Sequence, residues 1–244
     1  MSLDGRWMRE ANFSMTTDLS ALAPLHDAGV SNRLFCVEAA DRAGKTTLCD
    51  NLTTYLADRH GFEVRIFREP GGSPRAEQIR KVLKSEAGMA LPVDEQVRLF
   101  YEAREDLLRT TLLPWLAASN NRVAILDRYF WSTIVYQGFF RGADLGKLAE
   151  ITARVCDGAM PRRTYFLDIA PEVAHARVTA LGADADVDPN DLLAIEGKRQ
   201  LRDGYTALLN EFPEFIMRID ADQTPYELTR QVGDNLAFLA RSAT

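Results

Sequence analysis

The stretch EAADRAGKTT (38–47) nearly fits the phosphate-binding pattern G-x-x-x-x-G-K-[ST], with Ala39 in place of the first glycine. Lys45 is expected to reach the β- and γ-phosphates of a nucleotide, and the Thr46 hydroxyl to bind Mg²⁺. Alanine suits the first position only if its φ angle stays negative. The alternative, a chance Gly-Lys-Thr at a helix start, is disfavoured by the apolar run before it. The loop predicted to bind phosphates comprises Ala39, Ala40, Asp41, Arg42, Ala43, Gly44, Lys45, Thr46 and Thr47.

A second carboxylate, Asp127, ends the apolar run RVAILD (122–127). It is expected to lie near the phosphate loop and to hold the water shell of a metal ion. The alternative is that Asp127 caps the helix that follows. Arg128 comes next in the chain and is expected to point into the same cleft.

These motifs sit in a regular alternation of apolar runs and helical patterns. Strands are expected at 33–39, 63–67, 122–127, 163–168 and 215–220. Helices are expected at 45–59, 74–86, 93–118, 128–138, 144–157, 171–181, 191–211 and 224–240. The alternation predicts a three-layer α/β/α fold with a mainly parallel five-stranded sheet, whose ligands bind at the carboxyl ends of the strands.

The composition of the 244 residues narrows the classes of protein. The net charge of −6, without a basic stripe, argues against nucleic acid as the main partner. No apolar run is long enough to cross a membrane, and the three widely spaced cysteines indicate buried thiols in a reducing cytosol. Residues 1–32 are interpreted as a poorly ordered or loosely packed extension, and 33–244 as one domain.

Further motifs make the chain resemble the thymidylate kinase family from about Leu34 to Leu239. They are REPGG (68–72), LFYEAR (99–104), DRYFWSTIVYQG (127–138), FLDIAPE (166–172) and IDADQTP (219–225). The resemblance implies a P-loop nucleoside-monophosphate-kinase fold, ATP- and Mg²⁺-dependent conversion of dTMP to dTDP for dTTP synthesis, a homodimer and a cytoplasmic location. Two alternatives stay open: a kinase for another pyrimidine deoxynucleotide, including a modified one, and a non-catalytic nucleotide-binding regulator.

The resemblance also implies roles for individual residues. Arg68 and Arg128 would grip the dTMP phosphate, for which a planar guanidinium is well suited. Phe100 would stack on thymine, and Arg104 would bind its carbonyl edge. The remaining dTMP contacts would come from Asp41 at the 3′-hydroxyl, Ser132 and Thr133 at the base, Tyr136 beneath the sugar, where it excludes a 2′-hydroxyl, and Gln137. Gln223 would border adenine, while Trp131, Phe139 and Phe140 would only pack.

The remaining implied roles concern catalysis and the metal. Asp41, Arg42, Lys45 and Arg128 are assigned to catalysis, and Thr46, Asp127 and Asp41 to Mg²⁺. Members of the family carry a catalytic basic residue either in the phosphate loop or in a lid with the pattern D-R-x-E. Here the lid, at about 182–191, has DPND (188–191) at that pattern, and no Lys or Arg occurs between Arg177 and Lys198. Arg42 is therefore predicted to be the catalytic arginine; the alternative is a solvated loop arginine.

Overall fold

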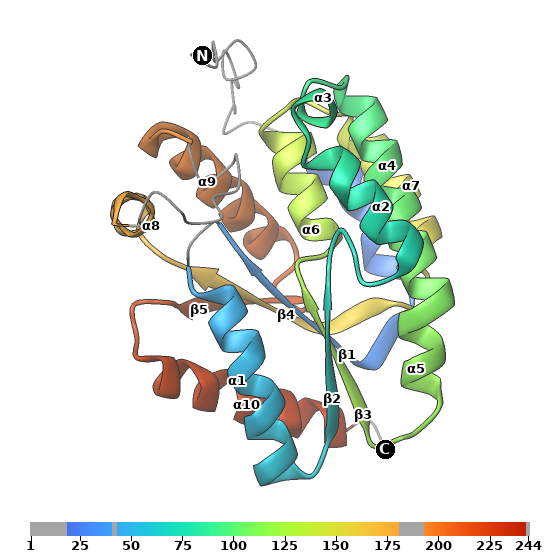
Figure 1. Ribbon diagram of the computed structural model, residues 1–244, viewed down its shortest axis with the longest axis vertical. Coiled ribbons are helices and arrows are strands. Elements are labelled where there is room, and N and C mark those ends of the chain that lie inside the picture. The colour runs from blue at the N-terminus through green and yellow to red at the C-terminus, as the bar shows by residue number, and fades with distance from the viewer. Residues whose placement is uncertain (1–18, 41–42, 181–192, 243–244) are drawn as a thin grey trace.

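A central sheet of five parallel strands organises the molecule (Figure 1). The computed structural model describes residues 19–40, 43–180 and 193–242. The strands lie in the order β2-β3-β1-β4-β5, and every pairing between them is parallel. Their bounds are β1 Val30–Ala39, β2 Glu63–Arg68, β3 Arg122–Asp127, β4 Met160–Asp168 and β5 Ile216–Asp220.

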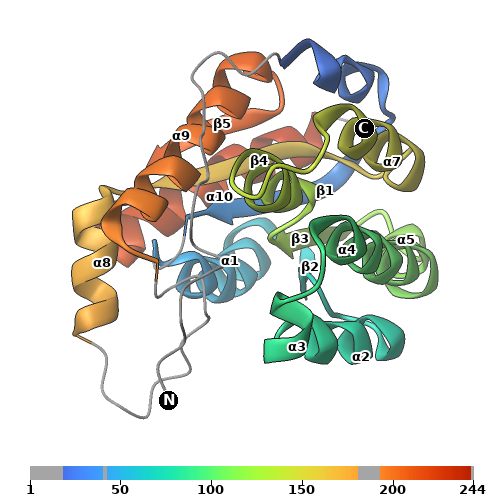
Figure 2. The ribbon, with the colours of Figure 1, turned by 90° about the horizontal axis from the view of Figure 1, so that it is seen from above.

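Helices cover both faces of this sheet, as the view from above shows (Figure 2). One face is covered by α1 (Lys45–His60) and α10 (Pro225–Arg241). The other face is covered by segments from η2 (Leu19–Asp27), η3 (Leu108–Leu112), α5 (Leu113–Ala117), α6 (Phe130–Thr133), η4 (Ile134–Phe139), α7 (Leu145–Val155) and α9 (Ile195–Glu211). The remaining helices are α2 (Pro74–Leu83), α3 (Glu86–Met89), α4 (Val93–Leu107) and α8 (Pro171–Thr179).

Alternate side chains of the central strand β1 enter two separate hydrophobic cores. Leu34 and Cys36 belong to the core beneath α7 and α9, whereas Phe35 and Val37 belong to the core beneath α1 and α10. A strand buried on both faces needs a continuous apolar sequence, which is the pattern seen in its second half. The predicted three-layer α/β/α fold with a parallel five-stranded sheet is confirmed.

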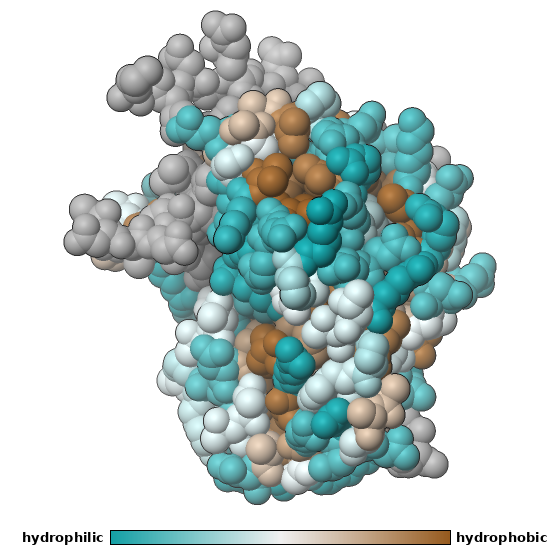
Figure 3. Space-filling model, turned by 45° about the vertical axis from the view of Figure 1, so that its right-hand side comes forward, coloured by the Kyte–Doolittle hydropathy of each residue, from teal (hydrophilic) through white to brown (hydrophobic). Residues whose placement is uncertain are grey.

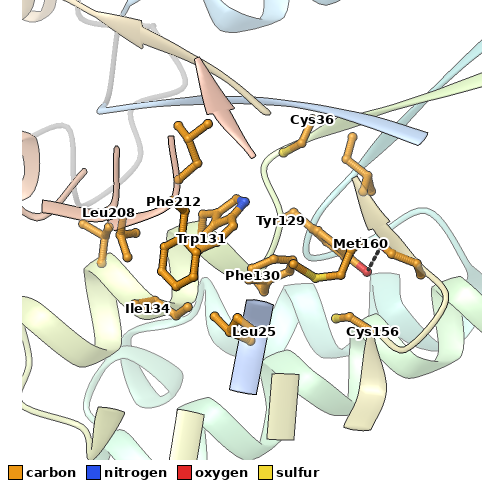
Figure 4. Close-up of a cluster of buried hydrophobic side chains, with 14 of the residues drawn as sticks. Leu25, Cys36, Tyr129, Phe130, Trp131, Ile134, Cys156, Met160, Leu208 and Phe212 are labelled. Atoms are coloured by element: carbon orange, nitrogen blue, oxygen red, sulfur yellow. Dashed lines mark hydrogen bonds between the residues drawn. The ribbon is translucent and has the colours of Figure 1, made fainter. Parts of the chain in front are cut away.

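The predicted start of the folded domain at residue 33 was wrong. Helix η2 lies before it, and β1 already pairs with β4 from Val30. Leu22 and Leu25 are fully buried in the core that also contains Trp131 and Phe212 (Figure 4). Their three-residue spacing places both on one side of a 3₁₀ turn, a segment too short to give a clear helical pattern. Residues 19–32 therefore belong to the fold, while 1–18 lie outside the described residues.

Three helices predicted as continuous are divided in the structure. The range 74–86 contains the end of α2 at Leu83 and the start of α3, and 93–118 is divided by the π-helical turn η3 between α4 and α5. Pro114, at the start of α5, lacks the N–H that an α-helical ladder would use there. The range 128–138 is divided in the same way by the π-helical turn η4. The predicted lid at 182–191 lies outside the described residues.

One face of the molecule is mainly hydrophilic. Figure 3 shows teal side chains over most of one face, with hydrophobic residues gathered in limited areas between them. Within residues 19–40, 43–180 and 193–242, no helix combines the length and hydropathy needed to cross a membrane.

Candidate active site

The motifs meet at the carboxyl edge of the sheet. In the strand register Val37 pairs with Asp127, and Asp127 pairs with Arg68. The phosphate loop, the DRY segment and the REPGG segment therefore begin side by side on three neighbouring strands. This is the position at which open parallel sheets bind their ligands.

The described parts of the phosphate loop have the expected backbone geometry. Gly44 has φ 89° and directly precedes α1, which begins at Lys45. Ala39 is the buried last residue of β1, and Arg128 alone among the described non-glycine residues has a positive φ. Alanine therefore replaces the first glycine without entering the left-handed region. Asp41 and Arg42 lie outside the described residues.

Lys45 and Asp127 form an ion pair at the base of this loop. Asp127 is buried, while Thr46, the first residue after the lysine, is exposed. A carboxylate and a hydroxyl are oxygen ligands of the kind Mg²⁺ uses when substrate phosphates complete its coordination. These two residues therefore fit the metal that the sequence motif implies.

A cavity of about 160 Å³ opens beside the phosphate loop, between the REPGG segment, α4 and the α6–η4 helix. All predicted dTMP-site residues within the described part of the chain line it: Arg68, Phe100, Arg104, Arg128, Ser132, Thr133, Tyr136 and Gln137. Asp41 is the remaining predicted contact and lies outside the described residues. Segments distant in sequence thus form one cavity.

Arg128 stands at the end of the cavity nearest the phosphate loop, in a strained backbone conformation with φ 70°. Its guanidinium Nη1 donates to the Ala39 carbonyl oxygen at 3.0 Å and to Ser132 Oγ at 3.2 Å. The guanidinium also lies over the ring of Tyr136, 5.3 Å from its centre. These contacts hold a cation beside the phosphate loop, where an anionic group of a ligand would be attracted.

A second polar group, which is buried, lines the same cavity. Arg104 Nε donates to Glu69 Oε2 at 2.8 Å, and its Nη2 donates to Thr133 Oγ1 at 3.1 Å. Arg104 Nη1 and Glu69 Oε1 are buried without a hydrogen-bond partner within the described part of the chain. A buried unpaired donor is costly, so a ligand carbonyl in the cavity would satisfy Arg104.

Burial raises the pKa of Glu69 to about 7, and the neighbouring Arg104 guanidinium opposes that rise. Phe100 is half-buried at the cavity wall and not within the core. This part of the cavity wall therefore combines a guanidinium with an aromatic face, a set of groups suited to a flat heterocycle that carries carbonyl oxygens.

Other lining residues were missed from the sequence. They are Glu69, Pro70, Arg80, Leu83, Lys84, Met89, Gln96, Tyr129, Phe140 and Arg141. Phe140 was expected to pack, and it does pack against the core, but it also lies on the cavity wall one helical turn after Tyr136. The spacing 132/133, 136/137 and 140/141 was the signal that could have revealed it. Trp131 and Phe139 are buried in the core, as predicted.

Gln223 lies apart from the cavity, just after the carboxyl end of β5. Its side-chain amide donates to the Asp220 carbonyl oxygen at 2.7 Å and to Gln231 Oε1 at 3.2 Å. The residue is at the same sheet edge as the phosphate loop, two strands away from β1. The contact of Gln223 with adenine therefore stays a prediction.

A phosphate loop, a Lys–Asp pair and a basic cavity at the carboxyl edge of a parallel α/β/α sheet define a P-loop nucleotide phosphotransferase. The family model described as "Thymidylate kinase" matches residues 37–232. The chain is 37% identical over 205 residues to the thymidylate kinase of Chlorobaculum tepidum, covering 82% of this chain and 94% of the relative. The protein belongs to the thymidylate kinase family.

Other known proteins agree with this assignment. A thymidylate kinase from Clostridium novyi is 33% identical over 187 residues, which are 77% of this chain and 89% of the relative. A crystal structure of thymidylate kinase from Ehrlichia chaffeensis superimposes with a TM-score of 0.65 at 24% identity, over 85% of this chain and 98% of that structure. At that identity the structural likeness concerns the fold.

Proposed function

We propose that this protein transfers the γ-phosphoryl group of ATP to dTMP, giving ADP and dTDP in the supply of dTTP. The observation that carries this proposal is the single cavity that unites Arg68 and Arg128 near the phosphate loop with Phe100 and Arg104. Membership of the thymidylate kinase family supports the same reaction.

In the acceptor site, Arg68 and Arg128 bind the dTMP phosphate, and Arg104 donates through Nη1 to a thymine carbonyl. Phe100 stacks on the base, and Tyr136 closes the space beneath the sugar against a 2′-hydroxyl. The rest of the acceptor site comprises Ser132, Thr133 and Gln137, with Asp41 at the 3′-hydroxyl. The unpaired, buried Nη1 of Arg104 supports this orientation of the base.

In the donor site, Lys45 leaves Asp127 and binds the β- and γ-phosphates, and loop N–H groups bind the remaining oxygens. Thr46 and Asp127, with Asp41, hold Mg²⁺, which neutralises charge on the phosphates when bound. Gln223 borders the adenine. Arg42 is the catalytic arginine of the proposal. Its support is its position in the sequence of the phosphate loop together with the arginine-free lid at 182–191.

The domain, the assembly and the location complete the proposal. We propose that the kinase domain includes residues 19–32, because η2 contributes Leu22 and Leu25 to the core. The family resemblance favours a homodimer in the cytoplasm. A non-catalytic regulator is disfavoured, because Lys45, Asp127 and both phosphate-site arginines are retained.

ATP consumption measured with every deoxyribo- and ribonucleoside monophosphate tests this proposal. dTMP should give the highest kcat/KM, and dUMP should follow within about 200-fold, because one methyl group in a pocket is worth only about 1–3 kcal/mol. The matched control is Lys45→Met, which should fold and show no turnover. A higher kcat/KM for dUMP, or turnover that survives Lys45→Met, would contradict the proposal.

A further inference from the structure

Glu38 is a buried carboxylate that no assigned role explains. It lies on β1 directly before Ala39, is fully buried, and is not among the residues that line the cavity. Its Oε1 accepts from the main-chain N–H groups of Tyr129 at 2.8 Å and Ser132 at 3.2 Å. Its Oε2 accepts from Ser132 Oγ at 2.6 Å and Tyr205 Oη at 3.0 Å. One carboxylate thus joins β1, the DRY segment and α9.

We propose that Glu38 is a positioning residue, which fixes the orientation of Arg128 for the acceptor phosphate. The inference rests on the proposed function, because it takes Arg128 as a ligand of dTMP. Two features of the structure carry it: the backbone of Arg128 and the side chain of Ser132.

The backbone of Arg128 is strained and held from both sides. A φ of 70° is in the left-handed region, which is unfavourable for a residue other than glycine. Its own N–H donates to the Val37 carbonyl oxygen at 3.1 Å, and the next N–H, that of Tyr129, donates to Glu38. The second of these bonds depends on Glu38, so the carboxylate helps to hold the turn from which the guanidinium extends.

The Ser132 hydroxyl links the Glu38 carboxylate to the Arg128 guanidinium through two hydrogen bonds. A hydroxyl has one hydrogen, and the 2.6 Å distance from Ser132 Oγ to Glu38 Oε2 assigns that hydrogen to the carboxylate. The lone pairs of the oxygen are then available to Arg128 Nη1, 3.2 Å away. Burial raises the pKa of Glu38, and the nearby positive charge of Arg128 opposes that rise, so the two groups stabilise each other's charged forms.

The variant Glu38→Gln tests this arrangement while keeping the size of the side chain. Its carbonyl oxygen can still accept from the two main-chain N–H groups. Its NH₂ group would face Ser132 Oγ and could only donate, so the Ser132 hydrogen turns away from residue 38 and competes with Arg128 Nη1 and Tyr205 Oη for the remaining positions around the oxygen. Isothermal titration with dTMP and steady-state kinetics with dTMP and ATP measure the result. Tyr205→Phe is the matched control, since it keeps the charge of Glu38 and removes a hydroxyl that donates to the same oxygen and also lies 2.9 Å from Ser132 Oγ.

We expect the dTMP Kd and KM of Glu38→Gln to rise on the order of 10–100-fold, as when other orienting partners are lost, with the KM for ATP unchanged. Tyr205→Phe should keep the dTMP Kd of the parent. In an Arg128→Ala background the effect of Glu38→Gln should vanish, because the two residues act as one unit. An unchanged dTMP Kd, equal changes for both substrates, or a full effect in the Arg128→Ala background would overturn the inference.

Two further variants keep the outcome clear. If Glu38→Gln does not fold, Ser132→Ala replaces it in the same cycle, and a full effect without Arg128 then overturns the proposed link through Ser132.

Arg68→Ala tests the acceptor site independently of Glu38, and it should abolish dTMP binding. Unchanged binding in Arg68→Ala would mean that the proposed acceptor site is wrong, and the inference would fail with it. Weak binding in Arg68→Ala with an unchanged Kd in Glu38→Gln would reject the inference alone.

Discussion

Two polar regions of the cavity wall differ in how their charged groups are held. We call the region around Arg104 and Glu69 the base end and the region around Arg68 and Arg128 the phosphate end. At the base end, Arg104 and Glu69 are both buried and hold each other in a direct ion pair, with Thr133 as a further partner. At the phosphate end, Arg68 is exposed at the end of β2, and Lys45 is paired with the carboxylate proposed to bind Mg²⁺.

The difference indicates how the two ends would recognise their targets. The base end is fixed by contacts within the protein, so among its described atoms the unpaired Arg104 Nη1 and Glu69 Oε1 remain for a ligand. The phosphate end instead presents charged groups that a phosphate can recruit, as charge stabilisation in phosphoryl transfer requires. The base end is therefore expected to determine which nucleotide binds, and the phosphate end to determine how fast it reacts.

The largest expected effect concerns Arg42, in the sequence of the phosphate loop. Its role is proposed from the sequence alone, because it lies outside the described residues. Arg42→Gly should lower kcat by about 10³–10⁵-fold, the usual consequence of losing a catalytic arginine. The Kd for dTMP should change little, because the contact forms mainly in the transition state. Pre-steady-state kinetics with saturating ATP and dTMP measures the chemical step.

A compensating substitution sharpens this prediction. Pro189→Arg restores an arginine at the lid pattern and should recover part of the lost rate in the Arg42→Gly background. An unchanged kcat in Arg42→Gly alone would mean that Arg42 is a bystander and that the positive charge comes from another part of the cleft.

An intermediate effect is expected at Tyr136, which lies between the two ends. Tyr136→Ala should lower the preference for dUMP over UMP, because removing the buried ring opens space for a 2′-hydroxyl. Tyr136→Phe retains the ring and should retain the preference. The ratio of kcat/KM values for dUMP and UMP isolates this effect, since the two substrates carry the same base. If the parent protein, Tyr136→Ala and Tyr136→Phe had the same ratio of kcat/KM values, Tyr136 would not determine which sugar is accepted.

The smallest expected effect is on stability at the base end. The pKa of Glu69 is raised to about 7, so between pH 4.5 and 7 the folded protein retains a proton that the unfolded chain has lost. The stabilisation is therefore complete below about pH 4.5 and is lost as the pH rises through 7, with a slope of at most about 1.4 kcal/mol per pH unit. Glu69→Gln should flatten the pH dependence of the free energy of unfolding, measured in urea.

The matched control for Glu69 is Glu95→Gln on α4. Glu95 is partly exposed, and Arg98 lowers its pKa, so it is ionised in both the folded and the unfolded states above pH 5. It should therefore leave the slope between pH 5 and 7 unchanged. Parallel curves for Glu69→Gln and the parent protein would show that Glu69 is already ionised across this range.

Much of the fold and of the candidate site could be predicted from the sequence. Apolar runs indicated the five strands, and Gly44, Lys45 and Asp127 indicated a phosphate site, because the ends of parallel strands meet at one edge. REPGG and DRY indicated the residues proposed for the acceptor site only through their resemblance to a family. Local sequence patterns indicate burial and backbone preference, because both produce a periodic pattern among residues that are close together in the chain.

Only the tertiary structure decided which distant groups share a contact. The burial of Leu22 and Leu25, the pairing of Glu69 with Arg104 and the cavity-facing position of Phe140 each depend on how separate elements pack. Glu38 is the clearest case, because four of the hydrogen bonds that it accepts come from the DRY segment and from α9, which are at least 91 residues away in the chain. A buried carboxylate is stable only when such partners surround it, and the partners are brought together by the packing of strands and helices.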